Sequence, residues 1–258
     1  DFSEDTKKLA ESIKEAVARG DIEIEVLGKN VVMNFTPTDS EQKELPQLLQ
    51  ETLNAIEKAK AAAGKSNKDV LVGGLEEKLK ELSEAADQAQ DALNKDKSEK
   101  EEFKKAEEKA ELTEDELKVA LKQEIGQGLV TVEKKEDKVI VTVGAGGAFP
   151  SGTAKLTPQA KKIMDNIAKV NSKGNSTIMV TGHTDNVPLV FGSQYRDNWD
   201  LAAARASSVV QSLEDSKVIS PGRLIATSKG ETQPVASNSS SAGRSKNRRI
   251  EIEINYGK

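Results

Sequence analysis

Residues 177–186 read TIMVTGHTDN, and residues 197–206 read DNWDLAAARA. The first stretch is an apolar run that ends in polar residues, which predicts a strand followed by a loop. The second begins with Asp and Asn, which are favoured at helix starts, and continues with residues of high helix propensity. We therefore expect Asp185 just beyond a strand and Arg205 about two turns into the next helix.

Asp185 and Arg205 form a pair of opposite charges that suits a ligand carrying both an ammonium and a carboxylate. A guanidinium binds a carboxylate through two parallel hydrogen bonds, and an aspartate accepts hydrogen bonds from an ammonium. The spacing alone also allows an internal ion pair between the two side chains, or two independent solvated charges. Of these three arrangements, only the internal ion pair requires the two side chains to contact each other.

The residues after 138 alternate between strand and helix patterns. Strands are expected at residues 139–143, 177–180, 224–228 and 249–254, and helices at residues 158–170 and 199–213. This order, βαβαββ, predicts an α+β sandwich in which a mixed sheet carries helices on one face. In the last strand, Ile250, Ile252 and Ile254 are expected to face the helices, while Glu251 and Glu253 face water.

Several separate segments between residues 139 and 254 agree in order with one known family. They are the Gly-His-Thr-Asp run that ends at Asp185, the helix that carries Arg205, and the Asn-Arg-Arg run at residues 247–249. Together they resemble the OmpA-like peptidoglycan-binding domain. The long loop before the helix is most similar to that of flagellar stator B-subunits of the MotB and PomB type.

The resemblance implies a function for individual residues. In that family, the residues that match Asp185 and Arg205 hold the two ends of the diaminopimelate side chain of peptidoglycan stem peptides. The resemblance further implies one group of residues that line the ligand and another group that supports the loop carrying the aspartate. The lining group is Leu201, Asn198, Phe149 and Ala148, and the supporting group is His183, Thr184, Asn247 and Arg249. Apart from the resemblance, a lone histidine does not favour a metal site, and His183 is expected to orient the loop by a local hydrogen bond.

The upstream half of the chain contains a similar pattern. Residues 9–35 and 117–143 carry apolar residues at a constant offset of 108, and each segment has a glycine that ends its helix. The match continues through an expected helix at residues 48–63 to residues 70–74, which align with residues 178–182. A partial internal duplication and two unrelated helix–hairpin units both remain compatible with this similarity.

Leucine and alanine recur at alternating spacings of four and three over residues 75–93, amid glutamate and lysine. This heptad seam of about three repeats predicts either a helix lying on its own domain, or a short dimer-forming coil or rod-like spacer. The expected domains are therefore a helix–hairpin unit at residues 1–74, a linker helix at residues 75–110, and the OmpA-like domain at residues 111–258.

Composition excludes several functional classes. The chain has 38 basic and 43 acidic residues, a net charge of −5, and only 3% aromatic residues, so nucleic acid is not an expected partner. It lacks cysteine and has one histidine, so no metal or cofactor is expected. The glycines of residues 144–149 lack the last glycine of the dinucleotide fingerprint, and no nucleophile–base pair is evident, so an enzyme is not expected.

With the resemblance, these features imply a periplasmic binding protein that anchors a flagellar stator to the cell wall. The expected partners are peptidoglycan, a second copy of the chain, and a stator A-subunit. The A-subunit is expected to be reached through an inner-membrane segment outside this sequence, because no stretch here approaches the roughly 20 apolar residues of a membrane span. The alternative is an envelope tether of the OmpA or peptidoglycan-associated lipoprotein kind, unrelated to motility.

Overall fold

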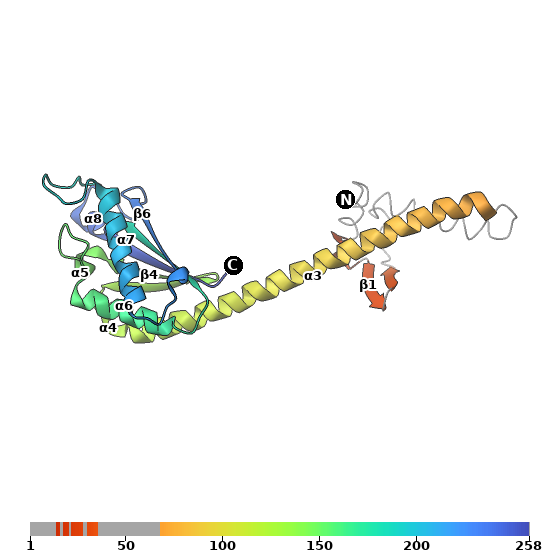
Figure 1. The fold of residues 1–258 in the computed structure, drawn as a ribbon, viewed down its shortest axis with the longest axis horizontal. Helices are drawn as coiled ribbons and strands as arrows, with labels where there is room; N and C mark the ends of the chain where they lie inside the picture. The colour runs from red at the N-terminus through yellow and green to blue at the C-terminus, as the bar shows by residue number, and fades with distance from the viewer. Residues whose placement is uncertain (1–13, 16–17, 21, 28–29, 36–67, 258) are drawn as a thin grey trace. The chain divides into compact units, whose positions relative to one another are not determined.

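The computed structural model describes residues 14–15, 18–20, 22–27, 30–35 and 68–257. The chain divides into two compact units, Asp1–Lys100 and Glu101–Lys258. Helix α3 (Lys68–Ala120) is the long charged helix that the sequence predicts upstream of the sheet (Figure 1). The domain boundaries expected after residues 74 and 110 both fall inside this helix.

In the first unit, β1 (Ile22–Leu27) and β2 (Asn30–Phe35) form the antiparallel hairpin that their alternating apolar residues predict. The helix expected at residues 48–63 lies outside the described residues. Residues 70–74, which align in sequence with part of a strand at 178–182, belong instead to α3. The expected continuation of the internal match beyond the hairpin is therefore wrong at the level of secondary structure.

The second unit contains a five-stranded mixed sheet in the order β3-β4-β7-β5-β6. Its central strand β7 runs antiparallel to both neighbours, β4 and β5, while β5 and β6 are parallel. The strands are β3 (Val130–Lys135), β4 (Lys138–Gly144), β5 (Thr177–His183), β6 (Leu224–Gly230) and β7 (Arg249–Asn255). The predicted βαβαββ order is confirmed, and β3 pairs with β4 as the expected hairpin.

Two helices, α6 (Pro158–Val170) and α7 (Asn198–Asp215), lie side by side on one face of the sheet (Figure 1). Each connects two parallel strands, so the two helices run in the same direction. The Thr157 hydroxyl caps α6, and the Asp197 carboxylate caps α7, each by accepting a hydrogen bond from a backbone N–H of the first turn.

The hydrophobic core lies between this helix layer and the inward face of the sheet, and the end of α3 belongs to it. Its members alternate along the strands and recur at helical spacing on the helices, as the period of each element requires. They include Leu117, Leu121, Val139, Val141, Val143, Ile163, Met164, Ile167, Ile178, Val180, Val209, Leu213, Ile250, Ile252 and Ile254. The inward placement of the three β7 isoleucines is thus confirmed.

The two β7 glutamates depart from the expectation that they simply face water. Glu251 accepts a 2.7 Å hydrogen bond from Nε of Arg249, and Glu253 accepts a 3.0 Å hydrogen bond from Nζ of Lys138. Both side chains are partly buried. The outer face of the sheet therefore carries ion pairs rather than isolated solvated charges.

Two short helices were missed by the sequence patterns. The glycine-rich segment after β4 forms α5 (Ala145–Ala148), because the Ala145 N–H donates to the Arg248 carbonyl at 2.9 Å and starts a turn there. The loop before β7 forms α8 (Ser241–Asn247), capped by the Ser240 hydroxyl, after the turn η1 (Pro221–Arg223) and β6. Helix α4 (Lys122–Gly126) joins α3 to β3.

Candidate ligand-binding site

Gly182 brings strand β5 against helix α7. A Cβ atom built on Gly182 would lie 2.1 Å from the carbonyl oxygen of Ala202, so no other residue fits there without moving backbone. Asp185 follows Gly182 by three residues, and Arg205 follows Ala202 by three. This close contact therefore positions the loop of Asp185 beside the turn of α7 that carries Arg205.

Asp185 is buried and accepts one hydrogen bond on each carboxylate oxygen. Its Oδ2 accepts a 2.6 Å hydrogen bond from Nη1 of Arg248, and its Oδ1 accepts a 3.0 Å hydrogen bond from the Val187 N–H. The Arg248 side chain is 40% exposed, whereas that of Asp185 is 11% exposed. The sequence places Arg248 in the Asn-Arg-Arg run at residues 247–249 but does not pair it with Asp185, because only the fold brings the start of β7 to this loop.

Arg205 is 5% exposed and packs on the segment between β4 and α6. Its Nε donates a 2.9 Å hydrogen bond to the carbonyl of Thr153, and its guanidinium carbon lies 5.0 Å from the centre of the Phe149 ring. That distance allows a cation–π interaction. Burial lowers the pKa of Arg205, but an arginine keeps its charge in proteins.

Asp185 and Arg205 lie in one charged cluster without binding each other. Among the described residues the carboxylate pairs with Arg248, and the guanidinium of Arg205 donates to a backbone carbonyl. Asp185 nevertheless acts to raise the pKa of Arg205, and Arg248 acts to lower it, so all three groups share one electrostatic environment. The cluster holds one negative and two positive charges, which favours a ligand carboxylate.

Asn198 braces the loop of Asp185 from inside. Its Nδ2 lies 3.2 Å from the Asp185 carbonyl, 3.1 Å from the Val187 carbonyl and 2.7 Å from the Glu231 carboxylate. The side chain is buried, and its amide hydrogens are used within the protein. Asn198 therefore braces this loop and links it to Glu231, just beyond the end of β6, and its expected ligand-lining role stays a prediction.

Asn247 and Arg249 support a neighbouring loop rather than the loop of Asp185 itself. The Asn247 Oδ1 accepts from two backbone N–H groups of residues 235–236, and its Nδ2 donates to the Ala236 carbonyl. Arg249 donates to the Gln233 carbonyl at 3.2 Å. Their effect on Asp185 is indirect, through the contacts of residues 230–231 with Thr184 and Asn198.

His183 and Thr184 are buried at the end of β5. Neither ring nitrogen of His183 makes a hydrogen bond within the described residues, and Nε2 lies 3.5 Å from Oε2 of Glu251. The hydrogen bond expected from His183 is therefore not formed within the described residues. Contact with His183, and then with Arg249, lowers the pKa of Glu251 to about 2.

The three apolar residues that were expected to line the site are buried. Phe149 and Ala148 are 2% and 1% exposed, and Leu201 is 5% exposed. Phe149 lies beneath the guanidinium of Arg205. The structure thus buries all three residues, and of these Phe149 packs against the side chain of Arg205.

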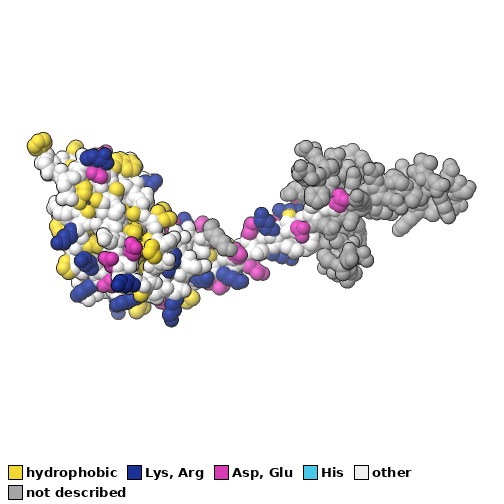
Figure 2. Space-filling model, in the orientation of Figure 1, with side chains coloured by type: hydrophobic (Ala, Val, Ile, Leu, Met, Phe, Trp, Pro, Cys, Tyr) yellow, Lys and Arg dark blue, Asp and Glu magenta, His cyan; other side chains and the backbone are white. Residues whose placement is uncertain are grey.

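The long loop between β5 and α7 presents hydrophobic side chains to solvent. Val187 and Val190 are 49% and 81% exposed, and Phe191 is fully exposed. Figure 2 shows hydrophobic side chains at the tip of this unit, with acidic and basic side chains interspersed over the rest of the visible face. Among the helices that the structure describes, none combines the length and hydrophobicity needed to cross a lipid bilayer.

Comparison with known proteins relates this part of the chain to one family. Residues 148–248 match the model of the OmpA family. The chain carries an OmpA-family domain. Its fold is that of a putative MotB like protein from Desulfovibrio vulgaris, with a TM-score of 0.55 and 24% identity over 60% of this chain and 95% of that one.

Two curated relatives of this OmpA-family domain show the range of the similarity. Motility protein B of Bacillus subtilis is 36% identical over 120 residues, which are 45% of this chain and 44% of that protein. Peptidoglycan-binding protein ArfA of Mycobacterium tuberculosis is 32% identical over 109 residues, 42% of this chain and 32% of that protein. The chain spans about half the length of the first curated relatives it matches.

Proposed function

We propose that the OmpA-family domain binds peptidoglycan non-covalently through the diaminopimelate residue of its stem peptides. The side chain of this residue ends in a carbon that carries both an ammonium and a carboxylate. Arg205 binds the carboxylate, and Asp185 accepts hydrogen bonds from the ammonium. The role is binding rather than catalysis.

The observation that carries this proposal is that Asp185 and Arg205 share one cluster but do not neutralise each other. A carboxylate offers about four lone-pair sites, so Asp185 can accept from a ligand while Arg248 and the Val187 N–H hold it in place. Arg205 uses Nε for Thr153, and its terminal nitrogens make no hydrogen bond within the described residues. The terminal N–H groups thus suit a ligand carboxylate.

We further propose that the complete protein works in the periplasm as a flagellar stator B-subunit. In this proposal residues 111–258 bind the wall, residues 1–110 act as spacer and dimerisation segment, and a membrane segment outside this sequence contacts the stator A-subunit. The similarity to Motility protein B supports this choice. Each binding site is weak because the ligand is small, and dimerisation raises the avidity.

Co-sedimentation with isolated peptidoglycan sacculi tests the binding proposal. The wild-type chain is expected to sediment with sacculi, and Asp185→Ala and Arg205→Ala are each expected to stay in the supernatant. Asp115→Ala and Arg196→Ala remove exposed charges outside the cluster and serve as matched controls. Circular dichroism checks that each variant is folded, and wall binding retained by both folded cluster variants contradicts the proposal.

Deletion of the gene distinguishes the role of a stator subunit from that of an envelope tether. A stator subunit predicts cells that assemble flagella but do not swim, with an intact envelope. A tether predicts normal swimming and an envelope that leaks periplasmic proteins.

A further inference from the structure

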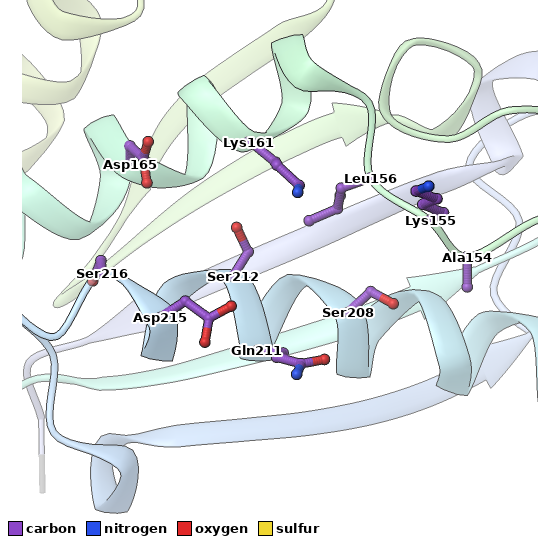
Figure 3. Close-up of a pocket in the computed structure, with 10 residues that line it drawn as sticks. All are labelled: Ala154, Lys155, Leu156, Lys161, Asp165, Ser208, Gln211, Ser212, Asp215 and Ser216. Carbon is purple, nitrogen blue, oxygen red and sulfur yellow. The ribbon is translucent and has the colours of Figure 1, made fainter.

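A polar groove of about 460 Å³ lies between α6 and α7. Helix α6 contributes Lys161 and Asp165, and α7 contributes Ser212 and Asp215. The segment before α6 closes one end with Ala154 and Lys155. Figure 3 shows Lys161 and Ser212 pointing into the space between the two helices, with Asp215 at the end far from Lys155.

The charged side chains of this groove are not used by the protein itself. Lys155, Lys161, Asp165 and Asp215 make no ion pair or side-chain hydrogen bond with any residue that the structure describes. Lysines near one end and aspartates near the other remain available to a ligand. A ligand therefore binds there without breaking internal contacts, which lowers the cost of binding.

The groove continues the charged cluster along α7. Ser208, Ser212 and Asp215 follow Arg205 by three, seven and ten residues, which places all four on one face of the helix. Ten residues of α-helix span about 15 Å. On the opposite wall, Thr153 accepts the hydrogen bond of Arg205, and the next residue, Ala154, already lines the groove.

We propose that this groove is a second subsite for peptidoglycan, and the inference rests on the function proposed above. It takes the part of the polymer that adjoins the diaminopimelate residue, namely a peptide segment with a free carboxylate and the amino sugar to which that segment is joined. Lys155 and Lys161 bind the carboxylate. Ser212 and Asp215 bind the sugar, because its hydroxyl groups both donate and accept hydrogen bonds.

Two ligands that differ only in the sugar test the subsite. One is the soluble stem tripeptide ending in diaminopimelate, and the other is the same tripeptide joined to its disaccharide. Isothermal titration of the wild-type chain is expected to show about tenfold tighter binding of the disaccharide-peptide, the factor for one or two additional net hydrogen bonds. Equal affinity of the wild-type chain for both ligands overturns the subsite.

Two groove variants and one control test whether the groove causes the tighter binding of the disaccharide-peptide. Ser212→Phe fills the groove, and Lys161→Glu reverses a charge in it, while Lys162→Glu makes the same reversal at an exposed neighbour that does not line it. Both groove variants are expected to lose about tenfold for the disaccharide-peptide, and Lys161→Glu also weakens the tripeptide a few-fold through the lost carboxylate contact. Lys162→Glu should match the wild-type chain.

The outcomes separate this inference from the function on which it rests. If the wild-type chain binds neither ligand, the proposed function fails, and the subsite fails with it. If Ser212→Phe and Lys161→Glu bind both ligands as the wild-type chain does, the subsite is wrong and the proposed function stands. If Ser212→Phe loses both ligands equally while its thermal melt is unchanged, the groove is not separate from the charged cluster, and the subsite is again wrong.

Discussion

Asp185 receives its 2.6 Å hydrogen bond from Arg248, while Arg205 on the neighbouring helix donates at 2.9 Å to the carbonyl of Thr153. The two groups that the family resemblance assigns to the ligand are thus held apart by separate partners. Each partner fixes one side chain without cancelling the charge of the other. Both side chains are therefore already positioned in the unbound protein, which lowers the cost of binding a ligand.

The first prediction concerns the Asp185–Arg248 pair. Because Arg248 is 40% exposed, solvent screens the pair, and Arg248→Ala should lower the free energy of unfolding by no more than about 1 kcal/mol. Urea denaturation measures this, with Lys246→Ala on the exposed side of α8 as control. A loss well above 2 kcal/mol would show that the pair holds the fold together instead of orienting the carboxylate.

Gly182→Ala tests the close approach of β5 and α7. The new methyl group meets the Ala202 carbonyl at 2.1 Å, so the strand and helix must separate, at roughly 1–3 kcal/mol of stability. Wall binding should fall as well, because the two charged residues move apart. Gly146→Ala, which meets nothing within 4 Å, is the matched control, and an unchanged melting temperature for Gly182→Ala would refute the packing argument.

The pH dependence of stability should report on Glu251. Contact with His183, and then with Arg249, lowers the pKa of this carboxyl from its ordinary value of 4.5 to about 2 in the folded protein. The unfolded chain therefore binds more protons, and this contribution to stability is complete above pH 4.5 and is lost as the pH falls toward about 2. In Glu251→Gln the unfolding free energy should fall less steeply over that window than in the wild-type chain.

Glu253→Gln is the control for the pH series, because Glu253 lies on the same face of β7 and pairs with Lys138. It should keep most of the wild-type slope between pH 4.5 and 2. If instead Glu251→Gln retains the full slope, another group carries the acid dependence.

Much of the fold is predictable from the sequence because its strands and helices have clear periods. Alternation at Ile250, Ile252 and Ile254 predicts which face of β7 is buried, and the Asp-Asn start predicts where α7 begins. The helix α5 is not predictable in this way, because its glycines oppose helix formation. A backbone contact to Arg248, far along the chain, stabilises it instead.

The candidate site is likewise only partly predictable from the sequence. Residue types and spacing nominate Asp185 and Arg205, since each charge lies at a predictable place on a strand end or a helix. The partners of these residues depend on which loops meet. Arg248, Thr153 and Glu231 therefore went unassigned, and the bracing contacts of Asn198 were not predicted.

Asn198→Ala should loosen the loop that carries Asp185. Its amide contacts two carbonyls of that loop and the Glu231 carboxylate, and their loss leaves buried acceptors unsatisfied at a cost of about 1–3 kcal/mol. Hydrogen exchange of the Val187 amide should accelerate, because that N–H bonds to Asp185. Asn175→Ala, at a site away from this loop, is the control, and unchanged exchange at Val187 would count against the bracing role.

The central claim is that one acid and one base clasp the two charges at the end of a single side chain. Titration calorimetry of the wild-type chain with two stem tripeptides tests it, one with diaminopimelate at the third position and one with lysine, which lacks the terminal carboxylate. Because the lysine peptide leaves Arg205 without its partner, we predict that it binds about 10- to 100-fold more weakly. Equal affinity for the two peptides would contradict the account.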